Sequence, residues 1–181
     1  MIPSLIASAQ LFQTAEYYLE RSLMGLERED LCRRLGPANS ILWHAGHMTI
    51  GRCRLLGLLG PGGPGGGERP VPWVAIFGKG ANEPEATALP EVGEVMALWE
   101  ALRAELPAWL EGLDEAAVAV PAPYDMPCSG QTVLGMINYM AFHEAYHLGQ
   151  INLARKALGR GHKRRTIDVV MAAASRGKPS P

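Results

Sequence analysis

Four long segments of this sequence carry apolar residues at three- and four-residue intervals, the spacing of amphipathic helices. They cover residues 4–23, 41–59, about 91–110 and 132–158. Asn39 or Ser40 is suited to cap the second helix, and Ser129 is a candidate cap before the fourth. Pro107 is expected to kink or end the third helix, because proline lacks the N–H that a helix needs. Strand-like alternation is scarce, so the sequence predicts an all-α fold, a four-helix bundle.

A long connection rich in glycine and proline separates the second and third predicted helices. It runs from about residue 60 to 90 and begins with GPGGPGGG, which argues against a regular element there. Four apolar residues within it are suited to anchor part of it on the core: Trp73, Val74, Ile76 and Phe77. No strand precedes the glycines and no Gly-Lys-Ser/Thr follows them, so a phosphate-binding loop is disfavoured. The length of the connection indicates a crossover rather than a simple up-and-down succession.

Composition places the chain among ordinary globular proteins. Its 181 residues are 48% hydrophobic, which suffices for the core of one domain spanning 1–181. The formal net charge of -1 excludes a globally basic nucleic-acid binder and a highly charged disordered chain. No apolar stretch approaches the ~18 residues of a membrane-spanning helix, and the N-terminus lacks the basic start of a secretory signal. We therefore expect a cytoplasmic protein that does not contact a membrane.

The cysteines and the basic C-terminal region carry less functional information. Cys32, Cys53 and Cys128 are odd in number and widely spaced, so we interpret them as reduced, mostly buried thiols. Basic residues crowd the extension from about 159 to 181, where Asp168 is the single acid. Nucleic-acid binding by this region is disfavoured, because no aromatic residues interleave the basic ones and no reading helix is recognisable.

Histidine shows the clearest functional pattern. Of five histidines, four form two close pairs, His44 with His47 and His143 with His147. On a helix, His143 and His147 differ by about 40° in direction and about 6 Å in height, so both rings can face one point. The stripe that contains them otherwise carries apolar residues and therefore points into the bundle. An imidazole in such a place needs a polar partner, and a metal ion is one.

The first histidine pair leaves a choice open. His44 and His47 lie three residues apart, about 60° from each other around the helix, and spacing alone does not decide which one faces the second pair. An all-imidazole site suits zinc, nickel, iron or copper better than magnesium or calcium. Three ligands would leave the exchangeable coordination position that catalysis requires. Ordinary buried histidines, satisfied by backbone carbonyls or tyrosines, are the alternative. His162 is interpreted as a solvated residue of a basic turn.

Two motifs, NSILWHAGHM and AFHEAYHLGQINLARKALG, resemble those of the DinB/YfiT-like metal-binding superfamily of four-helix bundles. The resemblance covers most of the chain and implies an up-down-down-up bundle, a homodimer and one divalent metal on three ligands. The family's ligands on the last helix fall on His143 and His147. Its ligand on the second helix follows a capped start by seven residues, which from Ser40 selects His47. His44 would then point into the pocket as a supporting or substrate group, or cover the bundle end.

The same resemblance implies a divalent-metal-dependent enzyme with thiol transferase-like or hydrolase-like chemistry on a small molecule. Zinc or nickel is the favoured metal, iron and manganese are alternatives, and a low-molecular-weight thiol is the implied co-reactant. A non-catalytic, metal-binding stress-response module is the alternative function, and a DNA-associated protein is less favoured. Catalytic residues stay unassigned, and the candidates near the site are His44, Arg54, Tyr139 and Gln150.

Two charged residues near the histidines are weighed separately. Arg54 lies seven residues after His47, nearly on the same helix face, and is suited to bind a carboxylate of a substrate or thiol, unless it is simply an exposed arginine. Glu144 points well away from its neighbour His143, so it is a poor candidate for a fourth ligand. Trp43 is interpreted as a core residue.

Overall fold

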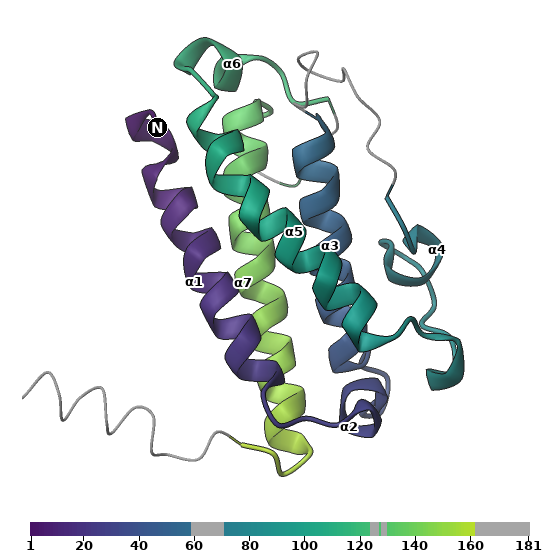
Figure 1. Cartoon of the computed structure of the whole chain (residues 1–181). Coiled ribbons are helices and arrows are strands. Elements are labelled where there is room, and N and C mark those ends of the chain that lie inside the picture. Colours follow the sequence, from purple (N-terminus) through teal and green to yellow (C-terminus); the bar gives the residue numbers. More distant parts are fainter. Residues whose placement is uncertain (59–70, 124–126, 128–129, 162–181) are drawn as a thin grey trace, which may run out of the picture.

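The computed structural model of the chain describes residues 1–58, 71–123, 127 and 130–161. Its framework is a bundle of long helices (Figure 1): α1 Ile6–Leu23, α3 Ile41–Leu58, α5 Val92–Glu111 and α7 Val133–Ala157. Within the described residues the only β-type pairing is an isolated bridge between Pro121 and Thr132. The predicted all-α fold is therefore confirmed. None of the described helices is long and apolar enough to cross a membrane.

The direction of the helices explains the need for a long connection. In Figure 1, α1 and α7 run downward, whereas α3 and α5 run upward. The chain must therefore return along the bundle between α3 and α5. The described part of this return contains α4 Val74–Phe77 and the 3-10 helix η2 Ala86–Ala88, and α4 packs against the outside of α3. Phe77 is fully buried and Trp73 and Ile76 pack against the core, so the predicted anchoring is confirmed for these three residues. Val74 is exposed and does not take part.

Three further short elements were not predicted, because they are too short to show a period. They are the 3-10 helix η1 Pro3–Leu5 and the helices α2 Arg28–Cys32 and α6 Glu115–Ala119. Local caps define two of them. Glu27 and Asp30 form a reciprocal capping box at the start of α2, and the Asp114 side chain accepts a hydrogen bond from the Ala117 N–H at the start of α6. Such pairs stabilise a single helical turn in a segment that looks like a charged loop.

The boundaries of the long helices follow their caps. The Trp43 N–H donates to the Ser40 hydroxyl over 3.1 Å, so Ser40, one of the two predicted caps, caps α3. Thr132 caps α7 by accepting from the Gly135 N–H, whereas Ser129, the cap considered from the sequence, lies outside the described residues. Pro107 does not end α5, which continues to Glu111. Leu106 and Leu110 are buried on either side of the proline, and their packing holds the last turn in place.

Buried side chains from the long helices form the core. Phe12 and Leu19 of α1, Trp99 of α5 and Ile151 of α7 are all buried in it. Cys32 and Cys53 are also buried, as small hydrophobic residues would be, and Cys128 lies outside the described residues. Much of the basic extension, including His162, lies outside them as well. Side chains from α1, α3, α5 and α7 thus share one buried interior.

Candidate metal centre

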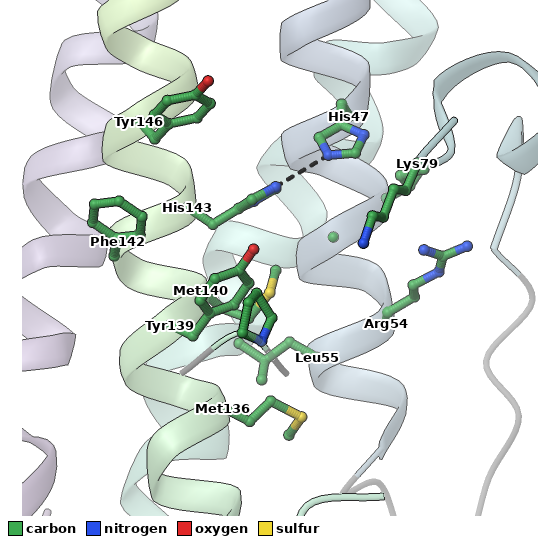
Figure 2. Close-up of a pocket in the computed structure, with 13 residues that line it drawn as sticks. His47, Arg54, Leu55, Lys79, Met136, Tyr139, Met140, Phe142, His143 and Tyr146 are labelled. Carbon is green, nitrogen blue, oxygen red and sulfur yellow. Dashed lines mark hydrogen bonds between the residues drawn. The ribbon is translucent and has the colours of Figure 1, made fainter. Parts of the chain in front are cut away.

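Three histidine side chains meet between α3 and α7. His143 Nε2 lies 3.1 Å from His47 Nε2 (Figure 2). It also lies 3.1 Å from His147 Nε2. The potential ligand atoms of the three residues all lie within 4.8 Å of one another. The four-residue spacing on α7 brings His143 and His147 to one face, and α3 presents His47 to the same point. The structure thus groups the three residues that the family resemblance selected.

The hydrogen-bonding pattern of this group fits a bound cation. His47 Nδ1 lies 2.5 Å from the Phe77 carbonyl oxygen and donates to it, which leaves the His47 Nε2 lone pair directed at His143. A proton on His143 Nε2 can satisfy only one of its two neighbouring imidazole nitrogens. Two ligands of a tetrahedral zinc ion, each at about 2.0–2.1 Å, lie roughly 3.3 Å apart, close to the spacing of these nitrogens. A metal ion would accept all three lone pairs at once.

Burial keeps these imidazoles in the neutral form that a metal requires. It lowers the pKa of His143 to about 4, and repulsion from His47 adds to the effect. Burial also lowers the pKa of His147, to about 3, and repulsion from His143 contributes. The pKa of His47 is lowered by burial as well, although its bond to the Phe77 carbonyl opposes the shift. At neutral pH all three rings therefore offer lone pairs rather than protons.

His44 lies behind the group rather than in it. Its Nδ1 is 3.0 Å from Nδ1 of His147, on the side of that ring that faces away from the other ligand atoms. A proton on His147 Nδ1 is donated to His44, and this tautomer leaves His147 Nε2 with a lone pair for the centre. His44 is buried, and burial lowers its pKa to about 4, so it too is neutral. This contact fits one of the roles considered for His44, that of a residue which supports a metal ligand, here His147.

The short helix α4 supports His47 in a way that the sequence did not reveal. The Trp43 indole N–H donates to the Ile76 carbonyl over 2.8 Å, and the Trp43 ring stacks on the His47 ring at 4.8 Å. A Cβ atom on Gly46 would lie 2.5 Å from the Phe77 ring, so only glycine admits that ring against α3. This close approach brings the Phe77 carbonyl to His47. A glycine inside a helix and between two histidines was the one available signal.

A cavity of about 790 Å³ opens beside the histidines. His47 and His143 form part of its wall, and Figure 2 shows them above residues from α3 on one side and α7 on the other. Of the candidates named from the sequence, Arg54 and Tyr139 line the cavity. Gln150 does not line it. Its amide donates to the Tyr146 hydroxyl over 3.1 Å, and its side chain also interacts with His147, where it opposes the lowering of the pKa. Lys79, which the sequence analysis missed, is a further wall residue.

A second polar cluster lies on the same helix pair. Arg52 of α3 is fully buried and donates to both carboxylate oxygens of Glu144, over 2.9 and 2.6 Å. It also donates to Glu16 of α1 over 2.6 Å, and its guanidinium lies 4.1 Å from the centre of the Trp99 ring system. Burial works to lower the pKa of Arg52, but the two carboxylates raise it above its ordinary value. Glu144 is thus engaged away from the histidines and does not add a fourth ligand.

The fold and the site together define a class: an all-α bundle with a three-histidine group that could hold a metal ion. A family model described as the DinB superfamily matches residues 11–151. The chain therefore belongs to the DinB superfamily, as its two histidine motifs predicted. A search of curated proteins gives no match.

Proposed function

We propose that this protein is a divalent-metal-dependent enzyme that acts on a small molecule, with thiol transferase-like or hydrolase-like chemistry. The observation that carries the proposal is the convergence of three neutral imidazole nitrogens beside a large cavity. Membership of the DinB superfamily supports it. We propose zinc or nickel as the metal, because imidazole ligands suit both ions.

His47, His143 and His147 would hold the metal, and a metal bound there lowers the pKa of a thiol or water molecule that it binds. The Phe77 carbonyl can only accept, so it keeps a proton on the outer nitrogen of His47 and leaves the inner nitrogen as a lone-pair donor. The His147 tautomer with its proton on Nδ1, toward His44, would leave the inner nitrogen of His147 in the same state. Three neutral ligands would leave the charge of a divalent ion uncompensated, so a bound ion would attract an anionic group of the substrate or co-reactant. The apolar cavity wall gives an organic molecule a surface to bind beside this group.

Metal analysis tests the ligand set. The protein is purified without a metal-affinity tag, and its metal content is compared with that of His47→Ala, His143→Ala and His147→Ala. We expect each of these variants to lose the metal. His44→Ala is the matched control, because it removes a neighbouring imidazole from outside the group, and it should retain most of the metal. Unchanged metal content in all three ligand variants would reject the site, and equal loss in His44→Ala would reject the assignment of His47 over His44.

A second experiment separates an enzyme from a non-catalytic metal-binding module. The protein is loaded with cobalt, and its absorption spectrum is recorded while a low-molecular-weight thiol is added. A change in the cobalt absorption bands shows an exchangeable coordination position, as the enzyme requires. A spectrum that does not respond to thiol, with a closed coordination shell, would favour the module. A screen of the metal-loaded protein with thiols and electrophilic acceptors then tests the reaction itself.

A further inference from the structure

Two positively charged side chains from separate segments lie in the wall of the cavity. Arg54 belongs to α3 and Lys79 follows α4, and both line the space that His47 and His143 also line (Figure 2). Within the described residues, no carboxylate lines the cavity, and neither cation has an ion pair or hydrogen bond. Arg103, by contrast, is ion-paired with three glutamates on the outside of the bundle. The cavity therefore carries positive charge without a counter-charge among the described residues.

The rest of the wall is mainly apolar, with two tyrosines. The facing helices contribute the apolar residues Ile50, Leu55, Met136, Met140 and Phe142, and Pro127 adds to them from outside the helices. The volume of about 790 Å³ lies within the range of roughly 300–1,000 Å³ that is typical of small-molecule sites. A fully polar ligand would leave this apolar surface unused, and a purely apolar one would leave both cations unpaired. The wall fits a molecule that has an apolar body and a negative end.

The position of Arg54 determines where the negative end of a bound molecule would lie in the cavity. Arg54 follows His47 by seven residues, which places the two Cα atoms roughly 10 Å apart along the axis of α3. The cationic end and the histidine end are therefore two separate parts of one cavity.

We propose that the cavity binds a small organic acid whose acid group contacts Arg54 and Lys79 and whose opposite end reaches His47 and His143. The planar guanidinium of Arg54 offers several N–H donors to a carboxylate, and the ammonium of Lys79 adds a mobile charge. The role of the opposite end rests on the proposed function, whereas the binding of the acid group does not. The substrate or thiol co-reactant is thus an organic acid rather than a neutral or cationic molecule.

A pair of thiols that differ only at the far end tests this proposal. We would titrate 6-mercaptohexanoate and 6-mercaptohexanol into the cobalt-loaded protein and follow the absorption bands. Arg54→Gln and Lys79→Gln should each weaken binding of the acid by about two- to fivefold, as expected for solvent-accessible ion pairs, and leave the alcohol unaffected. Arg34→Gln and Lys156→Gln make the same charge changes at exposed positions outside the cavity, and both thiols should bind to them as to the unaltered protein.

The outcomes separate this inference from the proposed function. Equal affinity for acid and alcohol in the unaltered protein, or an acid preference that survives both cavity substitutions, would overturn the anion-binding site. If neither thiol changes the cobalt spectrum, the exchangeable metal position fails instead. In that case, binding of the two thiols to the chelator-treated protein is measured by ligand-observed NMR. A preference for the acid that depends on Arg54 and Lys79 would then still support the site, and its absence would overturn it.

Discussion

The helix pair α3 and α7 carries two buried polar clusters whose atoms are satisfied in opposite ways. In the first, Arg52 is surrounded by the carboxylates of Glu144 and Glu16, and donors meet acceptors of opposite charge. In the second, three neutral imidazoles direct their inner nitrogens at one another. These nitrogens offer lone pairs, so each one faces another hydrogen-bond acceptor. His143 Nδ1 also has no hydrogen-bond partner within the described part of the chain. The first cluster is complete as it stands, and the second needs a cation.

This difference in hydrogen bonding distinguishes a structural cluster from a binding site, and it does so without comparison with homologous proteins. Glu144 directly follows His143, and successive residues on a helix point about 100° apart, so one turn of α7 serves both clusters. The ion pairs join α1, α3 and α7 behind the histidines. We call the group of Arg52, Glu144 and Glu16 the closed cluster, and the three-histidine group the open cluster. We infer that the closed cluster holds the two helices in the register that the open cluster requires. The following predictions break one cluster at a time.

Loss of the closed cluster should have the largest effect on stability. Glu144→Ala leaves the buried guanidinium of Arg52 with only Glu16, and breaking a buried pair in this way costs about 3–5 kcal/mol. Urea denaturation measures the change in the free energy of unfolding. Glu111→Ala removes an exposed carboxylate at the end of α5 and should change it by less than about 0.5 kcal/mol. A loss below about 1 kcal/mol in Glu144→Ala would contradict the structural role of the pair.

Zinc should stabilise the protein only through the open cluster. Zinc present at one hundred times its dissociation constant would add about 2.7 kcal/mol to the free energy of unfolding, because it binds the folded state. Thermal unfolding with chelator and then with zinc measures this gain in the unaltered protein and in His143→Ala. We expect the gain to vanish in the variant. An equal gain in both would mean that zinc binds elsewhere.

The support of His47 by α4 can be broken through Gly46. In Gly46→Ala the new methyl group would lie 2.5 Å from the Phe77 ring and force it away, a type of overpacking that costs about 1–3 kcal/mol. Displacement of the Phe77 carbonyl should also weaken zinc binding by about tenfold or more, since it orients the His47 ring. Urea denaturation and a competitive zinc titration measure the two effects.

Gly149→Ala is the matched control for this substitution. Gly149 also lies inside a long helix, but a Cβ atom there meets nothing within 4 Å, so alanine should be tolerated or slightly stabilising. If Gly46→Ala binds zinc as tightly as Gly149→Ala does, the α4 carbonyl has no part in holding the site.

The comparison also explains how far the sequence could predict this molecule. Helical period and the four-residue spacing of His143 and His147 are local patterns, and they predicted the bundle and one side of the site. The partners of Arg52 are 36 and 92 residues away, so nothing near it in the chain marks it as buried. Arg54 was singled out instead, because it shares a helix face with His47, and it does line the cavity.

The supports of the histidines were harder to predict. The partner of His47 is a backbone carbonyl, which every residue carries, so no residue type announces it. Lys79 reaches the cavity only because α4 docks on α3, and that docking depends on one glycine and one tryptophan on α3. The choice between His44 and His47 likewise depends on helix rotation, which a three-residue spacing does not determine.

The smallest effect that we predict is the contribution of His44 to the pH dependence of stability. Its pKa is about 4 in the folded protein, below the ordinary value of about 6.5, because burial disfavours the charged ring. Between these values the unfolded chain binds more protons than the folded protein, so stability falls as the pH drops through 6.5 and the loss is complete below about 4. Urea denaturation of the metal-free protein at pH 7.5 and pH 5 measures this fall.

His44→Gln removes one titrating group from that sum while leaving the three-histidine group in place, so its stability should fall less between the two pH values than that of the unaltered protein. The side-chain oxygen of the new glutamine can accept a hydrogen bond from His147 Nδ1, as His44 can, so the substitution should disturb His147 little. An identical fall in His44→Gln and in the unaltered protein would mean that the pKa of His44 does not change on unfolding, and that His44 has no part in the pH dependence of stability.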